Sequence, residues 1–167
     1  MIDNQIKICL TENAQVIYSR LGHDPAEYNT AYDGESSGLD LYNMGEKLTI
    51  HGRNKWVAFG EKHALIPTGV RVSIPEGHVG IIKERGSIVQ CGLMVRAGVI
   101  DPGYTGEIFV NLVNLGEKDT MIETGAKLPV QLIIVPCRSN FKTVSYSDFL
   151  NNNLDSKRQE GKIGSSD

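Results

Sequence analysis

Short apolar runs broken by glycine and proline recur along this chain of 167 residues, and no long amphipathic helical pattern separates them. Apolar and polar residues alternate in most of these runs, as they do along strands with one buried face. Strands are therefore expected at 5–10, 16–18, 47–50, 56–59, 63–82, 98–114, 125–136 and 141–150, the last closing with a helical turn at 148–150. Short strands punctuated in this way are typical of a β-sandwich or barrel, so the predicted fold class is all-β.

The length of the chain is that of one domain with a real hydrophobic core. From residue 151 onward the composition changes to Asn, Ser, Lys, Gln, Glu and Gly, which cannot form a packed core. We therefore expect a β-barrel domain over 1–150 and a mobile C-terminal arm over 151–167.

Charge and cysteine content limit the partners of the protein. A net charge of −3 and a pI near 5.8 give no general attraction to nucleic acid or to an anionic membrane, so a small-molecule partner is expected. Cys9, Cys91 and Cys137 form no C-x-x-C pair, which argues against a disulfide framework or a zinc site. The first residues lack the pattern of a signal peptide and no run reaches membrane-spanning length, so a cytoplasmic protein is expected.

The region 98–114 holds the most distinctive turn. Apolar residues lead up to Ile100, turn formers occupy 101–106, and alternation then resumes, which predicts a β-hairpin with a broad tip. Asp101 precedes Pro102, which holds it in an extended conformation and so orients its carboxylate. Tyr104 lies in the same loop, where an acid, an aromatic ring and free backbone groups can hold a small planar molecule. Taken alone, these residue types also fit an ordinary turn.

Three other positions bear on chemistry. Arg85 ends a predicted strand and is followed by Gly86 and Ser87, a combination that can bind phosphate oxygens but that also occurs at solvated strand edges. Asp40 alternates with two leucines and should face away from them, either to hold a loop or to organise a cation. Gln131 interrupts a strongly apolar strand and needs hydrogen-bond partners, from the core backbone or from a ligand.

The segment 19–36 lacks periodicity, which predicts an exposed loop excursion from the barrel, with one helical turn at 25–28. Tyr28 and Tyr32 lie in it. Their side chains either flank a ligand or simply pack, and packing is the more frequent role of tyrosines in loops.

Taken together and in order, these pieces resemble the five motifs of the homotrimeric all-β dUTP pyrophosphatase (dUTPase) family, as found in phages and bacteria. The third motif is the most specific, and the resemblance covers nearly the whole chain. The motifs correspond to residues 37–41, 85–87, 98–106, 125–132 and 158–166. The resemblance implies a dUTPase-like β-barrel of jelly-roll or β-clip type, assembled as a trimer, whose C-terminal arm closes the active site of a neighbouring subunit.

The resemblance also implies hydrolysis of dUTP to dUMP and pyrophosphate by water attack on the α-phosphorus. Asp101 would hold and activate the water, Tyr104 would pack on the deoxyribose, and Asp40 would support the site. The uracil edge would be read by backbone groups of Gly98, Val99 and Ile100. The phosphates would be bound by Arg85, Gly86, Ser87 and Gln131, and the arm would contribute Arg158, Ile163, Gly164, Ser165 and Ser166. Mg²⁺ would be held by the triphosphate, without a direct protein ligand.

The chain departs from the family pattern in three places. Gly86 stands where a serine normally follows the arginine, and Ser87 comes one place later. In the fifth motif, Gln159 replaces the first glycine and Ile163 replaces the aromatic residue that stacks on uracil. Loss of that stacking predicts weaker binding, by about 1 to 3 kcal/mol if base-stacking magnitudes apply.

Two alternative functions are open on this resemblance. The related dCTP deaminase shares the barrel and the Ile-Asp-Pro-Gly sequence, but it has a catalytic glutamate in the strand after the hairpin, where this chain has Asn111. An amide cannot accept and return the proton, so deamination is disfavoured. A non-catalytic trimer that binds a nucleotide or a regulatory protein through 19–36 is the other alternative, and the presence of Asp101 argues against it.

Overall fold

The protein was analysed as a computed structural model, which describes residues 5–30, 35–54, 56, 59–138 and 141–151. Strands dominate it, as predicted. They are β1 (Lys7–Leu10), β2 (Leu39–Tyr42), β3 (Leu48–Ile50), β4 (His63–Pro67), β5 (Val70–Ser73), β6 (His78–Glu84), β7 (Leu93–Arg96), β8 (Val99–Ile100), β9 (Phe109–Asn114), β10 (Thr120–Ile122) and β11 (Lys127–Pro136). The helices are α1 (Glu12–Arg20) and α2 (Tyr146–Asn151), with the short 3₁₀ helices η1 (Pro25–Glu27), η3 (Phe59–Lys62) and η4 (Gly86–Gln90). In the part of the chain that is described, no helix is long and apolar enough to cross a membrane.

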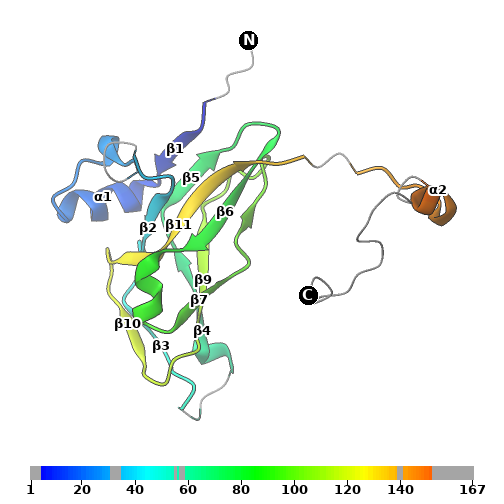
Figure 1. Ribbon diagram of the computed structural model, residues 1–167. Helices are drawn as coiled ribbons and strands as arrows, with labels where there is room; N and C mark the ends of the chain where they lie inside the picture. Colours follow the sequence, from blue (N-terminus) through cyan, green and yellow to red (C-terminus); the bar gives the residue numbers. More distant parts are fainter. Residues whose placement is uncertain (1–4, 31–34, 55, 57–58, 139–140, 152–167) are drawn as a thin grey trace.

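Antiparallel pairing arranges these strands in four small sheets (Figure 1). The largest has the order β2-β11-β6-β8, and a second has the order β4-β9-β7. β1 pairs with β5, and β3 pairs with β10. Alternating side chains from these strands fill one core, whose fully buried members include Leu41, Ile50, Ile66, Ile82, Ile108, Leu112 and Leu128.

The region 98–114 does not form the predicted hairpin. β8 pairs with β6, through Gly80 with Ile100 and Ile81 with Val99, whereas β9 pairs with β4 and β7. The loop between them therefore crosses from one sheet to another, and only its tight turn at 101–104 is as expected, with the Tyr104 N–H donating to the Asp101 carbonyl at 3.0 Å. Alternation identified both strands correctly, but it carries no information on which neighbour each strand chooses.

The prediction of a strand at 16–18 was also wrong, because these residues lie in helix α1. Thr11 caps the helix by accepting a hydrogen bond from the Ala14 N–H, and Glu12 lies in the first turn, where the helix dipole favours an acid. Ala14 and Ile17, three residues apart, face the core. A three-residue apolar run read in isolation cannot distinguish a helix from a strand, and the capping threonine was the signal that could have.

Two further strand predictions fail near gaps in the described chain. Of the run 56–59, residues 57–58 lie outside the described residues, and Phe59 begins the 3₁₀ helix η3. After β11 the chain leaves the body of the domain (Figure 1), and the described part of 141–150 holds helix α2 and no strand. Large apolar side chains there are exposed, namely Phe141, Val144, Tyr146, Phe149 and Leu150.

Gly69 joins β4 to β5 beneath helix α1. Its φ is +66°, and a β-carbon there would lie 2.1 Å from the Cβ atom of Ala14. The Thr11 N–H also donates to the Gly69 carbonyl at 2.7 Å, so the helix cannot simply move away. A glycine is needed here for its conformation and also for its lack of a side chain.

We expect Gly69→Ala to destabilise the protein strongly. Gly77→Ala is the matched control, because Gly77 also has a positive φ, of +78°, but a β-carbon there meets nothing within 4 Å. The control should lose about 1 kcal/mol of unfolding free energy from backbone strain alone. Gly69→Ala should lose about 1 to 3 kcal/mol more from overpacking. Urea denaturation of both variants measures the difference, and equal losses would contradict the contact between helix and turn.

Candidate active site

Asp40, on β2, is the centre of a cluster of three charges. Its Oδ1 atom lies 2.9 Å from Nε of Arg85, and its Oδ2 atom lies 2.8 Å from Nζ of Lys127. The Asp40 residue is 6% exposed, so the pairing keeps a buried carboxylate from being uncompensated. Its hydrogen bond raises the pKa of Lys127 against the opposing effect of partial burial. The cluster carries one net positive charge, which suits an anionic ligand.

An irregularity in β11 brings these groups together. The partners of β2 move from Lys127 to Gln131 on β11 while β2 itself advances only from Tyr42 to Asp40. The extra residues of this bulge include Pro129, whose carbonyl accepts a hydrogen bond from the Arg85 N–H at 2.9 Å. The bulge therefore holds the backbone of Arg85 while Asp40 holds its side chain.

Gln131 follows the bulge and lies across from Asp40. A β-carbon on Gly38 would be 2.2 Å from Oε1 of Gln131, so the glutamine side chain covers that glycine. The first and fourth sequence motifs thus meet here, and the polar residue that interrupts the apolar strand is directed at the edge strand that carries Asp40.

Arg85, Ser87 and Lys127 line a pocket of about 280 Å³. Gly86 begins η4 beside them, has no positive φ, and would meet nothing within 4 Å if it had a β-carbon. Its backbone therefore does not require glycine, and the departure from the serine pattern is not a steric necessity.

The loop after β8 is held from both sides. Gly98 packs so closely on β6 that a β-carbon would lie 2.7 Å from the Ile82 carbonyl oxygen, which explains the glycine. The hydroxyl of Tyr104 donates to the Glu107 carbonyl at 2.7 Å, and the Glu107 carboxylate accepts from the Gly69 N–H at 2.8 Å. Asp101 lies exposed at the start of this anchored loop, so its carboxylate is accessible.

The two groups of predicted site residues lie far apart within one chain. Ile100 pairs with Gly80 near the start of β6, so Asp101 lies beside that end, whereas Arg85 follows the opposite end of the same strand. At about 3.3 Å per residue, the separation along the strand is about 20 Å. A single chain therefore does not bring Asp101 and Arg85 to one ligand.

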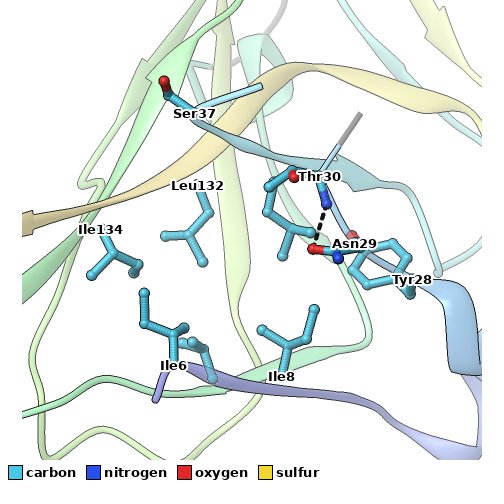
Figure 2. Close-up of a pocket in the computed structure, with 10 residues that line it drawn as sticks. Ile6, Ile8, Tyr28, Asn29, Thr30, Ser37, Leu132 and Ile134 are labelled. Atoms are coloured by element: carbon cyan, nitrogen blue, oxygen red, sulfur yellow. Dashed lines mark hydrogen bonds between the residues drawn. The ribbon is translucent and has the colours of Figure 1, made fainter. Parts of the chain in front are cut away.

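The larger pocket of about 390 Å³ lies elsewhere, between β1 and the β2–β11 pair. Figure 2 shows its mainly apolar wall, to which β1 contributes Ile8 and β11 contributes Leu132 and Ile134. Ser37 is its one lining residue from the first motif with a polar side chain, and none of the predicted catalytic or phosphate-binding residues lines it. Its chemistry does not match a triphosphate.

Sequence reasoning missed three residues that shape the site. Lys127 was part of a quoted motif without a role, Glu107 was read only as part of the alternation, and Tyr28 was placed on an exposed excursion although it is 7% exposed. A lysine near a buried acid was the available signal for Lys127. The predicted arm residues Arg158, Ile163, Gly164, Ser165 and Ser166 lie outside the described residues.

Comparison with known proteins decides between the possible functions. The family model for dUTPase matches residues 24–166, which is most of the chain. The chain belongs to the dUTPase family. This dUTPase is 31% identical over 154 residues to the deoxyuridine 5'-triphosphate nucleotidohydrolase of Hydrogenobaculum sp., with 90% of this chain and 96% of the relative covered. It is 36% identical over 156 residues to that of Mycolicibacterium gilvum, with 88% and 91% covered.

Solved structures confirm the fold. A mutant dUTPase of the 80alpha phage matches with a TM-score of 0.69 at 23% identity, covering 98% of this chain and 99% of that one. The dUTPase of EIAV matches with a TM-score of 0.61 at 26% identity, covering 84% and 96%. A mutant dUTPase from phage phi11 of S. aureus, which coordinates a structural Mg(II) ion, matches with a TM-score of 0.64 at 23% identity, covering 86% and 97%.

The enzyme is accordingly a dUTP diphosphatase, and it hydrolyses dUTP. The family assignment confirms the activity predicted from the motifs and leaves the deaminase and the non-catalytic trimer without support. Asn111, the residue used to argue against deamination, lies on β9.

Proposed function

We propose that this dUTPase cleaves its substrate by water attack on the α-phosphorus, with Asp101 as the general base. Asp101 would take a proton from the water as the new P–O bond forms, and pyrophosphate would leave as the bond to the β-phosphate breaks. The accessible carboxylate on an anchored loop supports this role. Such a base contributes most when its position is fixed before the substrate arrives.

The other residues of the third motif would form the nucleoside side of the site. Backbone groups of Gly98, Val99 and Ile100 would face the uracil, and the ring of Tyr104 would lie on the deoxyribose. The hydrogen bond from Tyr104 to Glu107 fixes that ring before binding, which supports a role in excluding a 2′-hydroxyl. Specificity for a deoxynucleotide would then be a matter of shape.

Arg85, Ser87 and Gln131 would bind the phosphates, with Gly86 allowing close approach of the backbone. Asp40 takes up the Nε atom of Arg85, so the two terminal nitrogens of the guanidinium are the ones directed to phosphate. Arg158, Ser165 and Ser166 of the arm would complete the enclosure at the γ-phosphate, with Ile163 and Gly164 over the base.

dUTPases use Mg²⁺. In this chain, Asp40 is already bonded to two cations, and no group of three His, Cys, Asp or Glu side chains gathers among the residues that the structure describes. We propose that the phosphate oxygens of dUTP supply the ion's ligands, since Mg²⁺ prefers hard oxygens and keeps several waters. When bound, the ion would neutralise charge on the triphosphate, while Arg85 and Ser87 orient that group.

A homotrimer with shared active sites is proposed for this enzyme, on one main observation. Asp101 and Arg85 lie at opposite ends of β6, so a complete site needs Asp101 from one chain and Arg85 from another. Exposed apolar side chains on one face of the β4-β9-β7 sheet support contacts between copies, namely Leu65, Met94 and Phe109. Because dUTP is an intracellular nucleotide, the cytoplasm is the proposed location.

Mixing two inactive variants tests the shared site. Asp101→Asn and Arg85→Ala chains should each be nearly inactive alone, yet their co-expression should restore about a quarter of wild-type activity. With random assembly, each site receives an intact Asp101 from half of its donors and an intact Arg85 from half of its donors. Turnover by tag-purified hybrids and their mass by ultracentrifugation are the measurements.

The matched control mixes Arg85→Ala with Asp40→Asn. These two residues are bonded within one chain, so no hybrid site contains both intact partners and activity should stay low. If the first mixture fails to recover activity, or if the monomer is active, the proposal of a shared site is contradicted. Recovery of activity in both mixtures would show that the recovery does not come from sites shared between subunits.

A further inference from the structure

We infer that Tyr28 is a positioning residue for the phosphate-binding arginine, acting through the main chain of Asp40. The inference rests on the proposed role of Arg85. Tyr28 follows η1 in the segment that the sequence marked as an exposed excursion. Its hydroxyl donates a hydrogen bond to the Asp40 carbonyl oxygen. A residue twelve positions before the first-motif acid thus contacts that acid directly.

The Tyr28 hydroxyl is fixed in place by its surroundings. The residue is 7% exposed, and its ring makes edge contacts with the rings of Tyr18, at 5.3 Å between centroids, and Tyr42, at 6.2 Å. Burial raises the pKa of the Tyr28 hydroxyl far above its usual value, so it stays protonated and can only donate to the carbonyl. The hydrogen bond is therefore present throughout the physiological pH range.

The position of β2 explains why this hydrogen bond matters. β2 is one of the two edge strands of its sheet, with β11 as its partner there, and its register with β11 is interrupted between Lys127 and Gln131. Strand pairing alone thus fixes Asp40 less firmly than it fixes a central strand. Tyr28 adds a contact to the same residue from the main-chain side.

Displacement of Asp40 would reach both cations of the cluster. Its two carboxylate oxygens are bonded separately to Arg85 and to Lys127. Lys127 also lies over the ring of Tyr42, with its Nζ atom 5.5 Å from the centroid. The aromatic cluster of Tyr18, Tyr28 and Tyr42 therefore contacts Asp40 at its carbonyl and Lys127 at its ammonium group. The Asp40 carboxylate in turn holds the side chain of Arg85.

A direct role of Tyr28 in binding a ligand is less well supported. Figure 2 shows Tyr28 and Asn29 at one end of the apolar pocket, where the Asn29 side chain accepts from the Thr30 N–H at 2.8 Å. The hydroxyl of Tyr28 is already committed to Asp40, so its remaining contribution to that pocket is apolar.

Tyr28→Phe tests the inference, because it removes the hydroxyl and keeps the buried ring. We expect kcat/KM for dUTP to fall about tenfold, as for a mispositioned binding group, with weaker binding of a non-hydrolysable dUTP analogue. Affinity for dUMP, which lacks the β- and γ-phosphates, should not change. The matched control is Tyr146→Phe, which removes the hydroxyl of an exposed tyrosine on α2, outside the aromatic cluster, and it should leave kcat/KM unchanged.

The same substitution in an Arg85→Ala background separates positioning from general damage. If Tyr28 acts mainly through Arg85, then Tyr28→Phe should cause a much smaller loss in that background, where only the contact of Asp40 with Lys127 is left to disturb. An undiminished loss there, equal losses in the Tyr146→Phe control, or wild-type kinetics for Tyr28→Phe would each overturn the inference while leaving the proposed function intact. A fully active Arg85→Ala single variant would instead overturn the proposed phosphate site, and this inference with it.

Discussion

Asp101→Asn should lower the turnover of dUTP by about a hundredfold to ten-thousandfold while leaving nucleotide affinity nearly unchanged, because general-base assistance is of that size. Asparagine keeps the shape of the side chain and its reach to the water but cannot accept the proton. The loop itself should be undisturbed, since Gly98, Tyr104 and Glu107 hold it without using the Asp101 carboxylate.

Two measurements on the Asn variant decide the matter, namely pyrophosphate release from dUTP and binding of a non-hydrolysable analogue. Loss of hydrolysis with retained binding supports the general base, and retained hydrolysis contradicts it. Asp119→Asn is a suitable control, because Asp119 is a surface carboxylate that contacts His51 and the Gly52 N–H, away from the loop. It should leave turnover at the wild-type level.

Arg85→Ala should reduce kcat/KM by about a hundredfold or more, the usual cost of removing a charged donor from a reacting phosphate or oxyanion. Arg85→Lys should recover little of this. The guanidinium bonds Asp40 through Nε and still offers its terminal nitrogens, whereas one ammonium group cannot serve Asp40 and a phosphate in the same geometry.

Steady-state kinetics of both Arg85 variants, with Arg71→Lys as the control, test this prediction. Arg71 is an exposed arginine on β5, outside the proposed site, so its replacement should have no effect on kinetics. Wild-type activity in Arg85→Lys would show that charge alone is needed at this position. A large effect of Arg71→Lys would show instead that the loss caused by replacing arginine with lysine is not specific to position 85.

Local chemistry explains what could be predicted from the sequence. Alternation located β5, β9 and β11, because each buries one set of alternate side chains. The resemblance to the family motifs gave Asp40 its supporting role, and the combination of Arg85, Gly86 and Ser87 at a strand end marked a possible phosphate site. The strand predictions hold because burial and periodicity act over a few residues.

Several of the failures involve choices made over long distances in the chain. No local pattern indicates that β8 joins β6 while β9 joins β4, so the loop of Asp101 was read as a hairpin. The packing role favoured for Tyr28 is confirmed, but its burial was not predicted, since that burial depends on Tyr18 and Tyr42, which come from separate elements. The separation of Asp101 from Arg85 likewise follows from strand register, which the sequence does not display.

Helix α1 has a consequence for the loop that carries Asp101. The family model begins matching at residue 24, after the helix has ended, yet the helix places Ala14 against Gly69 and Tyr18 against Tyr28. Gly69 in turn holds Glu107 of the Asp101 loop. Substitutions at Ala14 in this amino-terminal helix are therefore expected to reach the Asp101 loop through Gly69 and Glu107, at a distance from the residues proposed to meet the nucleotide.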